Sequence, residues 1–178
     1  GITNFQLGTG LSVYGVVAMA AYLFGGPLAD RFSARGMMTV ALFMTAIGGI
    51  YYATVPGMVG LWVMFAFWGV TTVFIFWAPM IRATRSWGGY ESQGKAFGIL
   101  DGGRGLVAAL IATVTVAVFA ALLPGDQALA SLEQRTVALK QVIWIFTGMA
   151  CAAGVVVWFC VTNENDREIV AKKSALSW

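Results

Sequence analysis

The sequence contains no histidine and only two cysteines, and charged residues make up just 11% of its 178 positions. Histidine and cysteine supply most metal ligands and many catalytic bases and nucleophiles, so their scarcity argues against such centres. Cys151 and Cys160 are nine positions apart, which places them on opposite faces of a helix and excludes a disulfide within it. We therefore expect no cofactor, no metal site, no catalytic residues and no enzymatic activity.

Hydrophobic residues are correspondingly abundant, at 59% of the chain. A soluble domain is roughly 45–50% apolar and about 25% charged, so this composition exceeds what one buried core of this size needs. The charged residues gather in short clusters between long uncharged runs, which is typical of repeated membrane spans. The net charge of +3 therefore predicts topology signals in loops and a lipid bilayer as partner, and not nucleic acid.

Five apolar runs are long enough to cross about 30 Å of hydrocarbon, which takes about 20 helical residues. A chain in lipid must satisfy its own backbone hydrogen bonds, and these runs lack the alternation of barrel strands, so we expect helices. The predicted fold class is an all-α integral membrane bundle. The predicted spans lie at about residues 7–29, 37–55, 58–81, 98–123 and 141–162.

The loops differ in charge from one side of the membrane to the other. Eight Lys or Arg residues fall on one side and two, Arg135 and Lys140, on the other. The side with more positive charge is expected to be cytoplasmic, which puts the carboxyl-terminal tail inside and the amino terminus outside. One further helix before Gly1 would give six helices with both ends in the cytoplasm. An aromatic belt is expected from the tryptophans near span ends, namely Trp62, Trp77, Trp144 and Trp158.

A charged motif connects the first two spans, with the sequence GPLADRFSAR at residues 26–35. It resembles the signature loop of the major facilitator superfamily, G-x-L-A-D-R-x-G-R-K, which joins the second and third helices of that family. The resemblance covers residues 1–178 as helices two to six of twelve, in the amino-terminal six-helix bundle. It implies a multi-pass protein of the cell (inner) membrane that carries a small-molecule substrate. The missing partners would be the first helix and the second six-helix half of the same chain.

Two interpretations of this motif remain open. Gly26, Asp30, Arg31 and Arg35 match the family pattern, in which the acid and its basic neighbours are thought to latch the two halves together at the cytoplasmic side. Ser33 stands where the family has a glycine, and Ala34 where it has a basic residue, which weakens the latch interpretation. The alternative is a plain positively charged turn, in which glycine only permits close helix approach.

The segment before and within the fourth span is rich in glycine. Gly94, Gly98 and Gly102 recur every four residues, which predicts a smooth helix ridge for close packing. Asp101 and Arg104 lie three residues apart, so their side chains can reach each other. Three roles remain open for them: a gating or structural ion pair, direct contact of Arg104 with an anionic substrate, or a proton relay through Asp101.

Two further arginines close the third span. Arg82 and Arg85 either pair with Asp30 or with Glu91 in their own loop, or simply hold the helix end at the membrane surface. The resemblance does not extend to the antiporter signature of the family's fifth helix, G-x-x-x-G-P-x-x-G-G. Its proline is missing from the corresponding residues 98–105, which argues against a drug–proton antiporter of the usual kind.

The family's fourth helix, here the third span, usually lines the central cavity. The resemblance therefore makes Trp68, Thr72 and Trp77 cavity-lining candidates, together with Tyr14 from the first span. Aromatic side chains with polar tips suit a sugar or an organic acid, although such residues in any span can equally be packing residues.

Three functions follow. The first is secondary active transport of a small solute, an organic anion or a sugar derivative, by alternating access. The second is a non-transporting scaffold or sensor with the same fold. The third, an intramembrane enzyme, would need a nucleophile and base or metal ligands within the spans, and none is visible.

Overall fold

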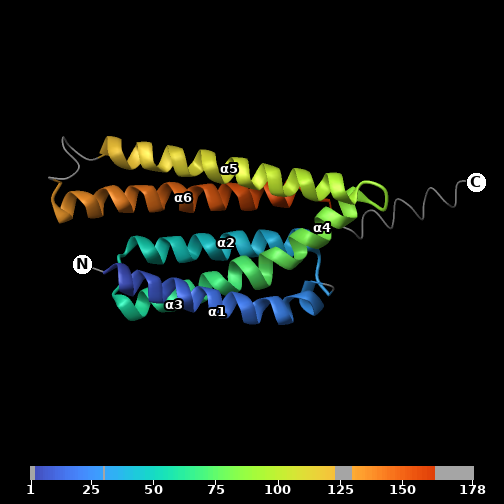
Figure 1. The fold of residues 1–178 in the computed structure, drawn as a ribbon, viewed down its shortest axis with the longest axis horizontal. Helices are drawn as coiled ribbons and strands as arrows, with labels where there is room; N and C mark the ends of the chain where they lie inside the picture. Colours follow the sequence, from blue (N-terminus) through green and yellow to red (C-terminus); the bar gives the residue numbers. More distant parts are fainter. Residues whose placement is uncertain (1–2, 30, 123–129, 163–178) are drawn as a thin grey trace, which may run out of the picture.

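The computed structural model describes residues 3–29, 31–122 and 130–162, and these form long helices without a strand among them (Figure 1). The third span combines three consecutive elements, because a π-helix interrupts it. The elements are α1 (Asn4–Ala29), α2 (Ala34–Ala53), α3 (Met58–Gly69), the π-helix η1 (Val70–Trp77), α4 (Ala78–Gly88), α5 (Gln93–Leu122) and α6 (Leu132–Cys160).

The predicted number of spans is confirmed. Within the described residues, five helical stretches are long and apolar enough to cross a membrane. The connections alternate between the two ends of the bundle: α1 joins α2 and α4 joins α5 at one end, whereas α2 joins α3 at the other (Figure 1). This alternation is what antiparallel spans with loops on opposite membrane faces require.

Three of the helices extend beyond the membrane spans that the sequence predicts. The third span continues to Gly88, the fourth begins at Gln93 and the fifth begins at Leu132. Apolar runs mark only the part of a helix that lies in hydrocarbon, whereas capping residues decide where the helix itself starts. Ser131 and Gln134 form such a cap before α6, because each side chain bonds the backbone N–H of the other residue.

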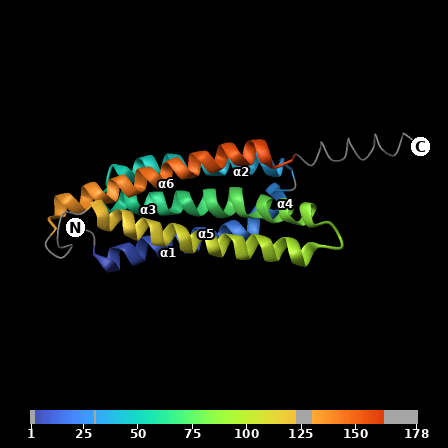
Figure 2. The same cartoon turned by 90° about the horizontal axis from the view of Figure 1, so that it is seen from above.

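Close packing between α2 and α6 depends on small residues. These two helices lie side by side in both views (Figures 1 and 2). A Cβ atom at Gly49 would collide with the hydroxyl of Thr147, and one at Gly154 would lie 3.3 Å from the ring of Phe43. Glycine at these positions therefore lets the two helix backbones approach, as is common where helices meet in membranes.

A second pair, α1 against α3 and η1, is built in the same way. A Cβ atom at Gly69 would lie 3.0 Å from the side chain of Val17, and one at Gly10 would lie 2.7 Å from the ring of Phe65. Helix α5 packs mainly against α4, and its most apolar window has no buried residue among the described ones. The exposed stripe of α2 is also apolar, and it comprises Val40, Phe43, Ile47, Ile50 and Tyr51.

The π-helix ends for a local reason. In η1 each carbonyl pairs with the N–H five residues later. The residue five positions after Phe74 is Pro79, which has no N–H, so this pairing cannot continue and α4 begins at Ala78. A Cβ atom at Gly25 would lie 3.6 Å from the carbonyl oxygen of Phe74. Glycine at position 25 therefore lets the backbone of α1 approach the π-helix closely.

Candidate functional site

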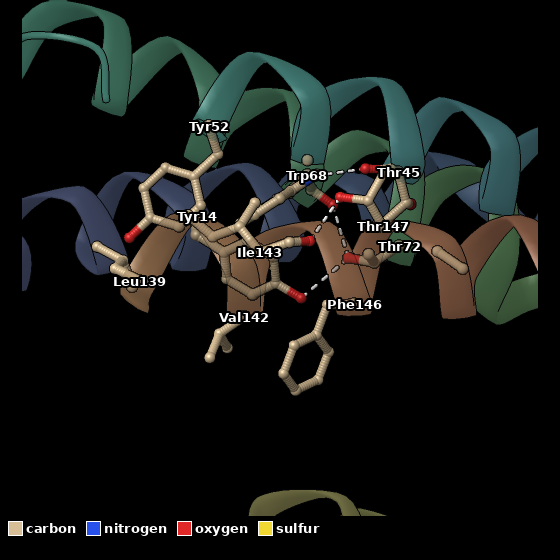
Figure 3. Close-up of a pocket in the computed structure, with 12 residues that line it drawn as sticks. Tyr14, Thr45, Tyr52, Trp68, Thr72, Leu139, Val142, Ile143, Phe146 and Thr147 are labelled. Carbon is tan, nitrogen blue, oxygen red and sulfur yellow. Dashed lines mark hydrogen bonds between the residues drawn. The ribbon is translucent and has the colours of Figure 1, made fainter. Parts of the chain in front are cut away.

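A cavity of about 470 Å³ lies between α1, α2, the α3–η1 span and α6 (Figure 3). Its lining carries no charged side chain, and it combines aromatic rings with hydroxyl groups. Three of the four predicted cavity residues, Tyr14, Trp68 and Thr72, line it, and Trp77 does not. The other lining residues are Thr45, Gly49, Tyr52, Leu139, Val142, Ile143, Phe146, Thr147 and Ala150. That a solute binds among them stays a prediction.

Hydrogen bonds orient the hydroxyl groups of this cavity. The Tyr14 and Thr72 hydroxyl oxygens are 3.0 Å apart, and the Thr72 hydroxyl lies 2.6 Å from the Trp68 carbonyl oxygen, to which it donates. A threonine hydroxyl carries a single hydrogen, so Tyr14 must donate to Thr72. The Tyr14 oxygen keeps acceptor capacity after this bond, and Tyr14 lines the cavity, so a hydroxylated solute could donate to it.

The indole of Trp68 is held rigidly. Its N–H donates to the Thr45 carbonyl oxygen at 3.1 Å, and its ring packs edge-on against Tyr52 and Phe65, with centroids 5.9 and 6.1 Å apart. The Thr45 hydroxyl also lies 3.1 Å from that of Thr71, which is fully buried. Helices α2 and η1 are thereby joined by polar contacts behind the cavity wall.

Within the described residues, the Tyr52 hydroxyl has no hydrogen-bond partner. Figure 3 shows its ring pointing toward Leu139 of α6. A phenol beside a cavity can both donate and accept a hydrogen bond. Tyr52 is therefore a candidate contact for a polar solute, and it was missed from the sequence because a tyrosine near a span end reads as an interfacial anchor.

Other lining residues were also missed. Thr45 and Thr147 give hydroxyl groups, and Phe146 gives an aromatic ring to the cavity wall. In the sequence, only the adjacent glycines Gly48 and Gly49 indicate that another helix packs closely against this part of α2. Nothing in the sequence says which helix makes that contact.

The expected pairing of Asp101 with Arg104 is confirmed. Arg104 Nη2 lies 3.2 Å from Asp101 Oδ1, and the two side chains are 53% and 63% exposed. The Arg104 guanidinium carbon also lies 4.7 Å from the ring centroid of Trp77, a cation–π arrangement. The ring of Tyr22 meets that of Trp77 edge-on, with centroids 6.5 Å apart. Trp77 is thus brought to the charged pair and not to the uncharged cavity.

The charged motif between α1 and α2 is only partly described. Gly26 lies in the last turn of α1, Asp30 lies outside the described residues, and Arg31 is exposed. The Arg35 guanidinium carbon lies 5.0 Å from the ring centroid of Trp158 on α6. Ser33 caps α2, because its hydroxyl accepts from the backbone N–H of Gly36 at 3.2 Å. This explains how a serine serves locally where the family pattern has a glycine.

The two arginines of α4 lie at the same end of the bundle. Arg82 Nη1 donates to the carbonyl oxygen of Phe32 at 3.5 Å, which ties α4 to the α1–α2 connection. The carbonyl of Arg85 accepts from the N–H of Gly89, whose φ of 59° ends the helix. The suggested pairing with Asp30 lies outside the described residues, and that with Glu91 stays a prediction.

The predicted glycine ridge makes no close contact among the described residues. A Cβ atom at Gly94, Gly98 or Gly102 would meet nothing within 4 Å. The ridge therefore faces open space here, and its packing against another segment stays a prediction. The glycines that do bring helices together lie elsewhere and include Gly10, Gly48, Gly49, Gly69 and Gly154.

The described cysteines are free, as expected for two residues on opposite faces of α6. Within residues 3–29, 31–122 and 130–162, no group of three or more His, Cys, Asp or Glu side chains could hold a metal ion. The cavity wall itself offers aromatic rings and hydroxyl groups.

The sequence matches known membrane proteins along nearly its whole length. The Major Facilitator Superfamily profile matches residues 1–177. "Inner membrane protein YqcE" of Escherichia coli is 32% identical over 169 residues, which cover 93% of this chain and 37% of that protein. "Inner membrane protein YihN" of the same organism is 27% identical over 172 residues, which cover 97% of this chain and 38% of that protein.

A more distant relative is "Uncharacterized protein MG294 homolog" of Mycoplasma pneumoniae, 30% identical over 116 residues, which cover 60% of this chain and 24% of that protein. No solved structure gives a significant match. The chain therefore spans little more than a third of the length of the two Escherichia coli relatives.

Proposed function

Because this chain belongs to the Major Facilitator Superfamily, we propose that it forms part of a secondary active transporter of a small solute. The transporter lies in the inner membrane and works by alternating access, with the carboxyl-terminal tail of this chain in the cytoplasm. Its solute is an organic anion or a sugar derivative. Residues 1–178 supply helices two to six of an amino-terminal six-helix bundle, and the rest of the longer protein supplies the remaining helices.

The observation that carries this proposal is the cavity of Figure 3. It lies between helices of the bundle, and carriers of this architecture bind their solute near the bilayer midplane, at the interface between structural repeats. A cavity of about 470 Å³ lies within the roughly 300–1,000 Å³ typical of small-molecule sites, and its mixed apolar and hydroxyl lining resembles theirs.

Cysteine accessibility in the full-length protein tests the proposal without a known solute. Thr72→Cys is placed in a background without other cysteines, so Cys151 and Cys160 become serine. A charged, membrane-impermeant thiol reagent is applied to right-side-out and to inverted vesicles. Alternating access predicts labelling of residue 72 from both sides, because the cavity opens to each side in turn.

The matched control is Ile47→Cys on the exposed apolar stripe of α2, where the side chain is 60% exposed. A thiol in lipid reacts poorly, since the thiolate is the reactive form and is disfavoured there. Residue 47 should remain unlabelled from both sides. Labelling of residue 72 from one side only, or from neither, would favour a static scaffold or sensor over a transporter.

A further inference from the structure

The π-helix η1 lies in the middle of a span that lines the candidate cavity. It has eight residues, Val70–Trp77, with regular α-helix before it in α3 and after it in α4. One of these residues, Thr72, belongs to the cavity wall. Most π-helices are single turns inserted in α-helices, and they occur frequently at functional sites. A longer one beside a cavity therefore calls for a functional explanation.

The element holds one residue more than a continuous α-helix would need. In π pairing each carbonyl bonds the N–H five residues later, whereas in α pairing it bonds the N–H four residues later. If η1 took α pairing, the part of the span beyond it would turn by roughly 100° and move by about 1.5 Å, which is one α-helical residue step. The orientation of α4 relative to α3 thus depends on the pairing of η1.

Pro79 does not favour one pairing over the other. It has no N–H, so in π pairing the carbonyl of Phe74, five residues earlier, lacks a donor. In α pairing the carbonyl of Ile75, four residues earlier, lacks one instead. Each arrangement therefore loses one backbone hydrogen bond at this proline.

At the start of η1, two hydroxyl groups satisfy a carbonyl in either pairing. The hydroxyls of Thr71 and Thr72 lie 3.3 and 2.6 Å from the carbonyl oxygen of Trp68, to which both donate. Threonines in regular α-helices make the same bonds to carbonyls three or four residues earlier. The Trp68 carbonyl therefore keeps donors when the backbone pairing changes. Two pairings with similar numbers of hydrogen bonds are what a two-state element requires.

The two halves of the span are held against α1 with different tightness. On the α3 side, a Cβ atom at Gly69 would lie 3.0 Å from the side chain of Val17. On the α4 side, a Cβ atom at Gly25 of α1 would lie 3.6 Å from the carbonyl oxygen of Phe74 and 3.8 Å from Ala78 Cβ, which are ordinary contact distances. A change of pairing should therefore turn α4 and leave α3 in place.

Two contacts depend on the present orientation of α4. The ring centroid of Trp77 lies 4.7 Å from the guanidinium carbon of Arg104 on α5. Arg82 Nη1 donates to the carbonyl oxygen of Phe32, between α1 and α2, at 3.5 Å. A turn of roughly 100° would carry Trp77 and Arg82 away from these partners. Because α5 packs mainly against α4, its position would change as well.

We propose, resting on the transport function above, that η1 is a switch between the two states of the transport cycle. In the state of Figure 1, π pairing holds α4 against α5 and against the α1–α2 connection at one end of the bundle. In the other state, α pairing turns α4 and releases both contacts. The cavity thereby changes the side of the membrane to which it opens.

Deletion of Phe76 in the full-length protein tests the switch. Without this residue, α pairing places α4 where π pairing places it in the intact chain, so the released state is no longer reached. The reporter is Ala150→Cys, on the cavity wall of α6, with Cys151 and Cys160 changed to serine. A charged, membrane-impermeant thiol reagent should label it from both sides in the undeleted protein. After the deletion we expect labelling from one side to fall at least about tenfold.

Two controls separate register from packing. Phe76→Ala shortens the same side chain but keeps the residue count, so both sides should still label, and loss of one side there would contradict the proposal. Deletion of Val40 removes an exposed residue from the regular helix α2. It should lower the melting temperature in detergent by at least about 10 °C, whereas deletion of Phe76 should change it by no more than about 4 °C.

The remaining outcomes also decide. If the protein without Phe76 folds and both sides still label equally, η1 is a static irregularity and the switch is wrong. If it melts as low as the Val40 deletion, deletion of Ile75 is measured in its place, because it changes the register equally. Failure of both shows that η1 holds no surplus residue and overturns the proposal. If the undeleted protein is labelled from one side only, the transport function fails, and the switch with it.

Discussion

Gly48 of α2 lies against the indole nitrogen of Trp68, and a Cβ atom at this position would collide with that nitrogen. The same indole N–H donates to the carbonyl oxygen of Thr45 at 3.1 Å. A glycine on one helix therefore determines where a tryptophan of the next helix lies. Because Trp68 lines the candidate cavity, this contact also sets the shape of the cavity wall.

Gly48→Ala should destabilise the protein, because the added methyl group displaces the indole and breaks its bond to Thr45. We expect a loss of roughly 1–3 kcal/mol, as for other overpacked sites. Thermal unfolding of the full-length protein in detergent measures this. Gly148→Ala is the control, since a Cβ atom there meets nothing within 4 Å. Equal melting temperatures for the two variants would show that Gly48 is not a close contact.

The bond between Tyr14 and Thr72 can be measured by a double-mutant cycle with Tyr14→Phe and Thr72→Val. We expect a coupling free energy of about 0.5–1.5 kcal/mol, which is the usual net value of one hydrogen bond. Reversible unfolding in mixed micelles gives the free energies. Thr113→Val is the matched control, because that hydroxyl bonds only the carbonyl of Ala109 in its own helix. Additive effects of Tyr14→Phe and Thr72→Val would mean that no such bond exists.

The charged motif can be tested through the accessibility of residue 72. If Asp30 and Arg31 latch the cytoplasmic side closed, then Asp30→Asn or Arg31→Ala should impair uptake while membrane insertion stays intact. Labelling of Thr72→Cys from the cytoplasmic side should rise by up to about fivefold, since an exposed ion pair contributes no more than about 1 kcal/mol. Unchanged labelling in both variants would leave the motif as a topology signal alone.

Gly98→Leu tests the glycine ridge of α5. If the ridge packs against a segment outside this chain, the leucine should lower the melting temperature of the full-length protein by opening the contact. Val107→Leu, at a position 52% exposed on the same helix, should have little effect. An unchanged melting temperature for Gly98→Leu would mean that the ridge faces lipid or water in the complete protein.

Local features of the fold and the site were predictable. The Asp101–Arg104 pair follows from a spacing of three residues on one helix, and the five spans follow from runs of apolar residues. Tyr14, Trp68 and Thr72 were selected as cavity residues by resemblance to a family, and they do line one cavity. Tyr52 and Thr147 were not selected, because a tyrosine or threonine in a span is equally compatible with packing.

The amino-acid sequence by itself determined the number of spans, their alternating direction and the local ion pair, because composition and helical period act over a few residues. Tertiary structure alone decided that Trp77 meets Arg104 and that Trp68 meets Thr45. The reason is physical: lipid and protein interior are both apolar, so the pattern of a span does not reveal which face packs against which helix. Only the close approach of the helices, permitted by particular glycines, settles those contacts.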